Sequence, residues 1–545
     1  MNVEFSLTRS TVVFRRAWRD RLSPLTRHIL SNLAVGLAIA IVLWSLHGTR
    51  SLRGVEDAGI DWVMRMQWSA PAKKPGVPFA LLDIDEATYR HWGEPFHTPR
   101  DRLLGLIDHA VQGGAALIVV DIDLSQRGHD PAADAKLQDY LAHYDAPGRP
   151  PLILSRAFRE PLDSETTPCR SERRSFLEED PRVAQSPLIH WGSPLFALDR
   201  DRVLRRWRLW EPVQANGQTD IVPSIQLLAV ALLQSRETAS GQIAQALQQA
   251  LAPLARGRCD PIQPSVALPG DHNASVVRIA GLTLSGQPDR MAQRILYTQP
   301  WRLQPGKARP SIPGSSGIAM VSLSIRSALP IGDRAVDPSW LAGRVVMIGA
   351  SFAESRDRHL TPLGEMPGTL VLINATQSLY RHGELTAPPL YVKLLVEAVL
   401  IVVMSLAFAR FSSFWGMMAS GLFIIAALLP ISFFLFRYGV WLDFAIPLLG
   451  VQLHKIAADF EATHHHQATN RSPPAALEAN SSPAPAGSLD SNPATVAGRP
   501  AAIPAPHSEP PGEHHGEARY EPSTGMDPDA VGADDAPAGS RGGLD

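Results

Sequence analysis

Cysteine is scarce in this chain of 545 residues, and its scarcity excludes several kinds of site. The only two cysteines, Cys169 and Cys259, belong to no C-x-x-C motif, which argues against a zinc site and against dithiol redox chemistry. Both fall in a region that we place outside the cytoplasm, where a disulfide between them is chemically permitted. The alternative is that they are two unpaired residues in surface insertions.

The chain also lacks a strong charge of one sign and the sequence signatures of catalysis. Its formal net charge is −2, so the charge balance gives no indication of a nucleic-acid-binding surface. It contains no P-loop, no G-x-S-x-G, no H-E-x-x-H and no protein-kinase signature. We therefore expect a protein that is not an enzyme, that binds no nucleic acid and that has no resident cofactor.

Large apolar side chains are nearly missing from the last stretch of the chain, residues 467–545. Proline, alanine, serine, glycine, histidine and acidic residues dominate there. Such a composition cannot bury enough apolar surface to offset the entropy lost on folding. We predict a disordered tail.

Long apolar runs, in contrast, are present. The first is 29–46, close to the roughly 20 residues that cross the core of a bilayer. Residues 1–28 precede it and are rich in arginine, and positive charge marks the side that stays in the cytoplasm. Because no A-x-A cleavage site follows the run, we predict an uncleaved transmembrane anchor with a cytoplasmic N-terminus.

Three further apolar runs lie close together, at 390–409, 415–436 and 440–457. Their short connections force neighbouring helices to run antiparallel. The predicted path crosses the membrane inward, outward and inward again, which leaves the tail in the cytoplasm. With the first run, this gives about four transmembrane helices and a membrane-embedded, multi-pass protein.

The region 50–388 between the anchors carries the pattern of an α/β domain with a partly parallel sheet. Short apolar runs of strand length occur at 79–84, 116–122 and 151–155. Between the first two, residues 98–101 (TPRD) predict a helix start with Thr98 as the N-cap. A strand, an amphipathic helix and a buried strand form a βαβ unit, whose strands are parallel. The pair Asp130-Pro131 predicts the start of a further helix by the same capping logic.

The later half of this region is less regular. The alternation in 203–210 (VLRRWRLW) predicts a strand with one solvent-facing side. Helices are expected over 223–234 and 367–381, a solvated helix or an insertion over 236–258, and a core strand over 344–349.

Acidic residues follow two of the predicted strands in D-x-D spacing. If these strands are neighbours, the acids converge at the carboxyl edge of the sheet, where open α/β sheets bind ligands. An all-oxygen site suits a divalent cation such as calcium or magnesium, or a cationic ligand. The alternative is that the acids cap loops and helices or pair with Arg65 and Arg100. The candidate ligand-binding residues are Asp83, Asp85, Asp121, Asp123 and, after the strand 344–349, Asp357.

An ordered series of short elements over about 340 residues resembles the CHASE type 2 domain, an extracytoplasmic sensory domain found with cyclases and histidine kinases. The elements that carry the resemblance are Asp61–Arg65, Ala80–Glu86, Trp92-Gly93 with Thr98-Pro99-Arg100, Gly113–Leu124, Ile295–Pro300, Leu341–Ala350, Asp357, Thr361-Pro362 and Pro367-Gly368. By this resemblance Ile295–Pro300 is expected to be a later strand of the domain. The chain departs from the family's pattern at His97-Thr98, where an aromatic residue is usual. One membrane helix before the domain and three after it are also the usual arrangement.

The resemblance implies a sensor in a bacterial inner membrane, with its α/β domain in the periplasm. The family usually feeds a cytoplasmic output domain, and no such domain is expected in residues 467–545, so the signal would pass to a separate cytoplasmic signalling protein. The stimulus would be a small ligand or an envelope protein. Sensors of this kind often work as homodimers, which no heptad pattern here decides.

Two other functions compete with the sensor. The α/β domain could be a structural or docking subunit of an envelope complex. It could also be a metal-dependent extracytoplasmic enzyme, since D-x-D occurs in metal-dependent glycosyltransferases.

Overall fold

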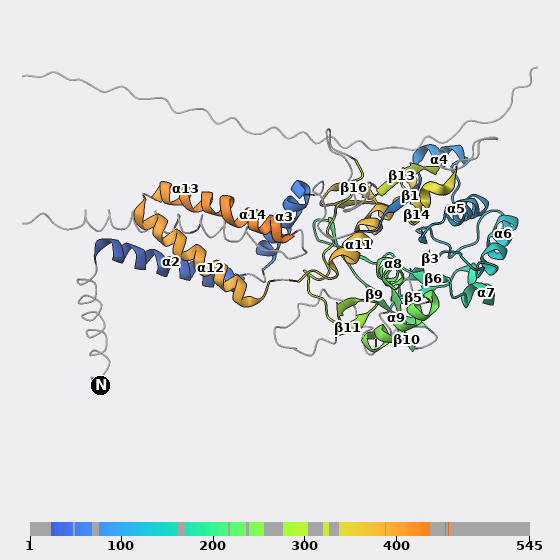
Figure 1. Ribbon diagram of the computed structural model, residues 1–545, viewed down its shortest axis with the longest axis horizontal. Helices are drawn as coiled ribbons and strands as arrows, with labels where there is room; N and C mark the ends of the chain where they lie inside the picture. The colour runs from blue at the N-terminus through green and yellow to red at the C-terminus, as the bar shows by residue number, and fades with distance from the viewer. Residues whose placement is uncertain are drawn as a thin grey trace, which may run out of the picture. The chain divides into compact units, whose positions relative to one another are not determined.

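The structure is a computed structural model that describes the α/β region and most of the apolar helices (Figure 1). The predictions for Cys259, for 440–457 except Leu453 and Ile456, and for the tail 467–545 lie outside the described residues. The described ranges are 23–46, 49–67, 76–161, 169–215, 218–235, 239–255, 276–302, 320–325, 337–386, 388–411 and 413–436, with residues 453 and 456.

A six-stranded parallel sheet is the centre of the α/β region. Its strand order is β13-β1-β14-β2-β3-β6, and every neighbouring pair is parallel. The predicted mixed α/β fold with a parallel sheet is therefore confirmed. The two D-x-D strands are not neighbours, however, because a strand from much later in the chain lies between them. The strands are β1 (Phe79–Ile84), β2 (Leu117–Val120), β3 (Leu152–Ser155), β6 (Ile189–Gly192), β13 (Met320–Ser324) and β14 (Val345–Ala350).

Helices cover both faces of this sheet, because alternate strand residues bury their side chains on opposite sides. One face, which includes Leu81 and Met347, packs against α8 (Ile225–Gln234) and α11 (Gly368–His382). The other face packs against α5 (Arg100–Gln112) and α6 (Pro131–Ala142).

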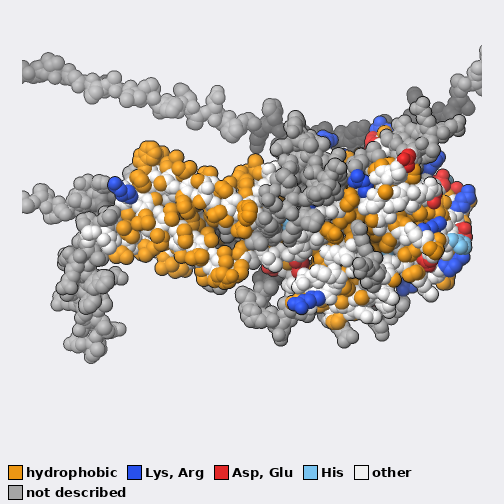
Figure 2. Space-filling view, in the orientation of Figure 1, with side chains coloured by type: hydrophobic (Ala, Val, Ile, Leu, Met, Phe, Trp, Pro, Cys, Tyr) orange, Lys and Arg blue, Asp and Glu red, His pale blue; other side chains and the backbone are white. Residues whose placement is uncertain are grey.

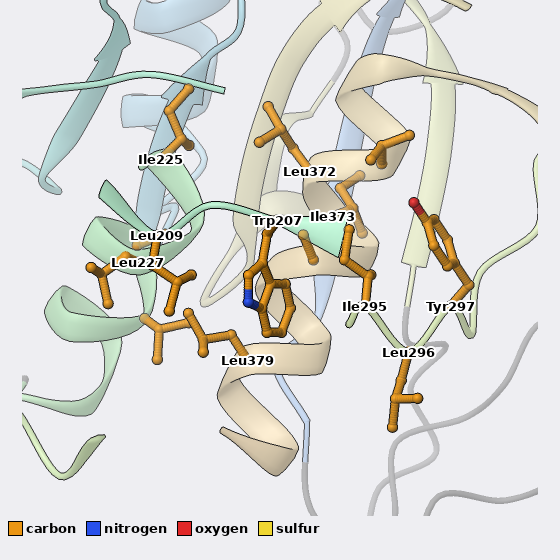
Figure 3. Close-up of a cluster of buried hydrophobic side chains, with 14 of the residues drawn as sticks. Trp207, Leu209, Ile225, Leu227, Ile295, Leu296, Tyr297, Leu372, Ile373 and Leu379 are labelled. Carbon is orange, nitrogen blue, oxygen red and sulfur yellow. The ribbon is translucent and has the colours of Figure 1, made fainter. Parts of the chain in front are cut away.

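A second, four-stranded sheet and several short pairs extend the first face. Figure 3 shows Trp207 among the side chains of α8 and α11, close to Leu227 and Leu379.

The second sheet has the order β10-β9-β5-β4. Its strands and the remaining ones are β4 (Ala157–Arg159), β5 (Ser171–Arg173), β7 (Phe196–Leu198), β8 (Leu204–Trp207), β9 (Trp210–Ala215), β10 (Gln218–Pro223), β11 (Val276–Ile279), β12 (Leu282–Ser285), β15 (Arg358–Thr361) and β16 (Gly364–Pro367). The remaining helices of the region are α3 (Arg50–Gln67), α4 (Glu86–His91), α7 (Pro181–Ala184) and α9 (Ser240–Ala255), with 3₁₀ turns at Phe176–Glu179, Pro338–Leu341 and Ala353–Ser355.

The two predicted helix starts have different outcomes. Asp130 caps α6 as expected, because its carboxylate accepts a hydrogen bond of 2.9 Å from the N–H of Ala132. The prediction for α5 is wrong by one position. The helix begins at Arg100 with Pro99 as the N-cap, and no side chain caps it, since proline carries no acceptor group.

Two predicted strands are also corrected. Residues 203–210 form β8 and the start of β9, and all of β8 is buried, because carboxylates pair with its arginines. Residues 295–300 are not a regular strand. Side chains of α11 replace a partner strand there: the Ser378 hydroxyl accepts from the N–H of Leu296, and Asn374 Oδ1 accepts from the N–H groups of Thr298 and Gln299.

The apolar helices form a separate group. They are α2 (Pro24–Leu46), α12 (Leu390–Arg410) and α13 (Ser413–Phe423), which continues through a π-helical turn, Ile424–Leu428, into α14 (Leu429–Phe436). Pro430 follows this turn and lacks the N–H that a regular α-helix would use, which accounts for the wider turn.

Two segments in the described part of the chain are long and apolar enough to cross a membrane, Tyr391–Arg410 and Phe414–Phe436. α2 contributes a shorter apolar stretch, Ile29–Leu43. The predicted total of about four transmembrane helices is therefore not confirmed. Figure 2 shows these helices covered with hydrophobic side chains. α2 and α12 pack closely, because a Cβ at Gly36 would lie only 3.0 Å from Ile401 Cγ2.

Candidate functional site

Two of the five candidate acids lie in one row across the sheet. Asp83 on β1 is in register with Gly349 on β14. Asp121 directly follows β2 on the other side of β14, and its N–H donates to the carbonyl of Ile348 at 2.8 Å. Side chains in the same row of a parallel sheet point to the same face. The row Asp83–Gly349–Asp121, which we call the acidic row, therefore places two carboxyl groups on the α11 face, on either side of a glycine.

The first turn of α11 covers this row. A Cβ on Gly349 would overlap the side chain of Thr369, so only glycine lets the helix approach so closely. The Thr369 hydroxyl donates a hydrogen bond of 3.0 Å to Asp121 Oδ2. The helix N-terminus thus lies directly over the carboxyl edge of the sheet, where its unpaired N–H groups favour negative charge.

Asp357 lies on the other side of this turn. Its backbone carbonyl accepts from the N–H of Gly368 at 2.9 Å, and a Cβ on Gly368 would overlap its carboxylate. His359 Nε2 is 2.9 Å from Asp357 Oδ1. Asp121 and Asp357 therefore lie against the start of α11, and Asp83 lies in the same row of the sheet as Asp121, on the other side of Gly349.

The other two acids do not join them. Asp85 is the N-cap of α4, where its Oδ1 accepts from the N–H and the hydroxyl of Thr88 at 2.9 and 2.6 Å. Asp123 accepts from the N–H of Ser125 at 2.8 Å in an exposed turn. Both have the capping role of the alternative interpretation, because the chain leaves each strand before it reaches them.

The two arginines that the alternative interpretation names as partners have their closest contacts elsewhere, although the charge of Asp123 also acts on Arg100. Arg65 Nε donates to the carbonyl of Pro362 at 3.0 Å, and Arg100 is 3.7 Å from Asp134. That the acids bind a ligand stays a prediction. In the described part of the chain, no group of three or more His, Cys, Asp or Glu side chains is arranged to hold a metal ion.

Burial changes the acidity of both carboxyl groups in the row. It raises the pKa of Asp83 to about 7, with a hydrogen bond of 2.8 Å from the Ser351 hydroxyl opposing the change and the charge of Asp85 adding to it. Burial likewise raises the pKa of Asp121 to about 7, and the nearby charge of Asp357 adds to this, while Thr369 and His359 oppose it. Both groups therefore change protonation near neutral pH.

A second polar feature, which sequence reasoning missed, joins α3 to the α/β region. It is a buried network of ion pairs that we call the α3 network. Asp61 is 2.8 Å from Arg205 Nη2 and 2.5 Å from Arg294 Nη2, and Asp57 is 2.6 Å from Arg206 Nη2. Its members are Asp57, Asp61, Asp199, Asp201, Arg205, Arg206, Arg290 and Arg294.

Opposite charges balance within the α3 network, since it contains as many aspartates as arginines. Burial acts to raise the pKa of Asp57, but three neighbouring arginines outweigh burial and hold the pKa below its usual value. Two signals in the sequence pointed to the network. Asp57 and Asp61 are one helical turn apart, and Arg205-Arg206 interrupt an otherwise apolar strand.

A hairpin connects the two features. β15 carries His359, the β15–β16 turn contains Pro362, which accepts from Arg65 of α3, and β16 runs directly into α11. One short hairpin therefore touches the acidic row, α3 and α11.

Of the two cysteines, only Cys169 lies among the described residues, and it is disulfide-bonded.

Comparison with known proteins gives one result. The family model of the CHASE2 domain matches residues 34–409, which include most of α2, the whole α/β region and nearly all of α12. No curated protein and no solved structure matches the chain.

Proposed function

The chain belongs to the CHASE2 domain family, and from this premise we propose that it is a membrane-anchored sensor. In this proposal the α/β domain lies on the periplasmic side of a bacterial inner membrane, and its state is passed to a separate cytoplasmic signalling protein. The family implies the extracytoplasmic sensory role. The anchoring, the topology and the partner are the parts that we add.

Apolar surface supports the anchoring. Side chains on α2, α12, α13 and α14 are exposed although they are large and hydrophobic, which is unfavourable in water and favourable in lipid. They include Leu33, Leu37, Ile41, Leu394, Leu395, Val402, Leu406, Trp415, Leu422, Ile425, Ile431 and Phe434.

The α3 network is the observation that best supports signalling through these helices. α3 begins four residues after α2 ends, and a helix held by buried ion pairs has to move with the strand that supplies its partners. α3 also contacts the last membrane helix described, because Gln67 Nε2 donates to the carbonyl of Phe433 at 3.0 Å and the Trp62 ring lies 5.5 Å from the Phe433 ring. A change within the α/β domain has a direct route to the membrane through α3.

A second route runs through α11, which ends at His382, only a short segment before α12 begins at Leu390. α2 and α12 pack against each other, so the two routes meet. Such an arrangement suits a sensor better than a passive docking subunit, which needs no mechanical link to its anchors.

The test is a deletion in the producing bacterium. Cells carrying the full chain are compared with cells whose chain lacks residues 50–388 but keeps the apolar helices, and transcription is profiled while the medium is varied. We expect a set of responses that needs the α/β domain. Identical profiles in both strains, together with loss of a co-purifying envelope complex on deletion, would refute the sensor and favour the docking role.

A further inference from the structure

The two carboxyl groups of the acidic row are buried in a place where no arginine or lysine side chain balances them among the described residues. Asp83 is only 4% exposed and Asp121 is partly buried, yet no arginine or lysine pairs with either among the described residues. A structural aspartate at such a place is normally compensated by a cation, because an ionised carboxylate without one is costly to bury.

The groups that face these carboxyls are few. Asp121 faces Asp357 from the loop after β14, His359 from β15 and the neutral hydroxyl of Thr369 from α11. Asp83 faces Ser351 and the charge of Asp85. Apart from the Asp357–His359 pair, the groups around the row are acids or neutral hydroxyls.

We propose that the Asp83–Gly349–Asp121 row, with Asp357 and His359, is a proton-sensing site whose state is passed to α12 through α11. The proposal rests on the proposed function and names the stimulus of that sensor as extracytoplasmic pH. Its geometric basis is that the first turn of α11 lies between Asp121 and Asp357, so that the charge of both carboxyls acts on the helix that leads to the membrane.

The direction of the response follows from the chemistry. When the row is protonated, its carboxyls are neutral and do not repel Asp357, so the first turn of α11 is held in place. When pH rises, Asp83 and Asp121 become charged in a buried setting. Asp121 and Asp357 then repel each other across the turn. The N–H groups of α11 and the Thr369 hydroxyl favour the charged form of Asp121, but burial and the charge of Asp357 outweigh them. Rising pH therefore loosens the N-terminus of α11.

Proton linkage gives the expected size of this effect. The pKa of Asp121, whose Oδ2 accepts from Thr369 of α11, is raised, so this group stabilises the closed turn fully below its ordinary pKa of 3.8, and this stabilisation is lost as pH rises to about 7. Opening of the turn should become up to about tenfold easier per pH unit between about pH 5 and about pH 7, and then level off.

The experiment uses the full-length protein in lipid nanodiscs with no partner present. Infrared difference spectra report protonated carboxyls as pH is raised, and hydrogen exchange, corrected for its intrinsic pH dependence, reports the opening of residues 368–382. Asp83→Asn and Asp121→Asn are neutral at every pH and similar in shape to the protonated acid. Asp139→Asn, at an exposed acid on α6, is the matched control.

We expect a carboxyl signal with a midpoint near pH 7 that each Asn variant of the row reduces and the control leaves intact. Glu384 also has a pKa raised to about 7 by burial, so the difference between variants, not the total signal, assigns the row. The pH dependence of exchange should flatten in the double variant. If one Asn variant fails to fold, the other single variant still assigns its own carboxyl by the same difference from wild type.

Two results would overturn the site: no carboxyl that changes protonation between about pH 5 and about pH 9, or exchange in α11 with the same pH dependence in wild type and double variant. A titrating row in the purified protein, combined with no transcriptional role in cells, would refute the proposed sensor but not the site. An intact transcriptional role with a silent row would do the reverse.

Discussion

At the scale of single residues, Gly349 decides how closely α11 approaches the sheet. It lies in the middle of the acidic row, and any side chain there would meet Thr369. A matched position exists on α5, where a Cβ on the exposed Gly105 would meet nothing within 4 Å.

We predict that Gly349→Ala destabilises the fold by about 1–3 kcal/mol, the usual cost of overpacking a tight core site. Gly105→Ala should instead stabilise the protein by about 0.5–1 kcal/mol, because alanine is the better helix former. Thermal unfolding of the full-length protein in detergent measures both. Equal melting temperatures for the two variants would show that α11 does not press on the row as described.

The acidic residues also differ in how well the sequence alone predicts their place in the fold. Asp83, Asp121 and Asp357 were selected because acids that follow parallel strands share an edge of the sheet, and that rule depends only on local pattern. The same rule grouped Asp85 and Asp123 with them, but both make capping hydrogen bonds instead, because a capping role depends on where the strand ends. Arg205 and Arg206 pair partly with the nearby Asp199 and Asp201, but their partners on α3 could not be predicted, since that helix lies about 145 residues earlier in the chain.

At the scale of elements, the α3 network fastens one helix to the rest of the α/β region. Asp61 bridges two buried arginines, Arg205 and Arg294, which would lose that partner if it were removed. Asp201 contacts Arg205 too, but its side chain is 54% exposed and water can replace it.

Removal of Asp61 should therefore be far more damaging than removal of Asp201. We expect Asp61→Asn to lower the free energy of unfolding by about 3–5 kcal/mol, because it leaves buried positive charge uncompensated. Asp201→Asn should cost less than about 1 kcal/mol, as exposed ion pairs do. Chemical denaturation of the two variants beside wild type gives the difference. A milder effect for Asp61→Asn than for Asp201→Asn would show that α3 is not fastened by this network.

For β1 and β14, local sequence pattern predicts where each strand begins and ends to within one residue, but not that the two strands lie next to each other. β1 has the bounds expected for it, and β14 is displaced by one residue, because both are continuous apolar runs of strand length. Their adjacency was not foreseen, since β14 reaches the centre of the sheet from far along the chain. Residues 295–300 have the composition of a strand, but their backbone partners are side chains of α11, which no periodicity reveals.

At the scale of the whole molecule, a CHASE2 domain is connected to its apolar helices by α3 on the N-terminal side and by α11 on the C-terminal side. α3 is held by ion pairs, and α11 covers the acidic row at one end and leads to α12 at the other. The proposed signal transfer along these helices requires that the α/β domain lies outside the cytoplasm and that the short connection between α12 and α13 lies inside.

The measurement that tests this arrangement most directly is cysteine labelling in intact cells with a reagent that does not cross membranes. Phe96→Cys replaces a side chain that is 94% exposed in the α/β domain, and Phe411→Cys replaces one that is 52% exposed after α12. Wild type controls for its own cysteines. We predict labelling of Phe96→Cys in intact cells once the reagent reaches the periplasm, and labelling of Phe411→Cys only after the inner membrane is permeabilised. Protection of Phe96→Cys with open labelling of Phe411→Cys would contradict the extracytoplasmic sensor.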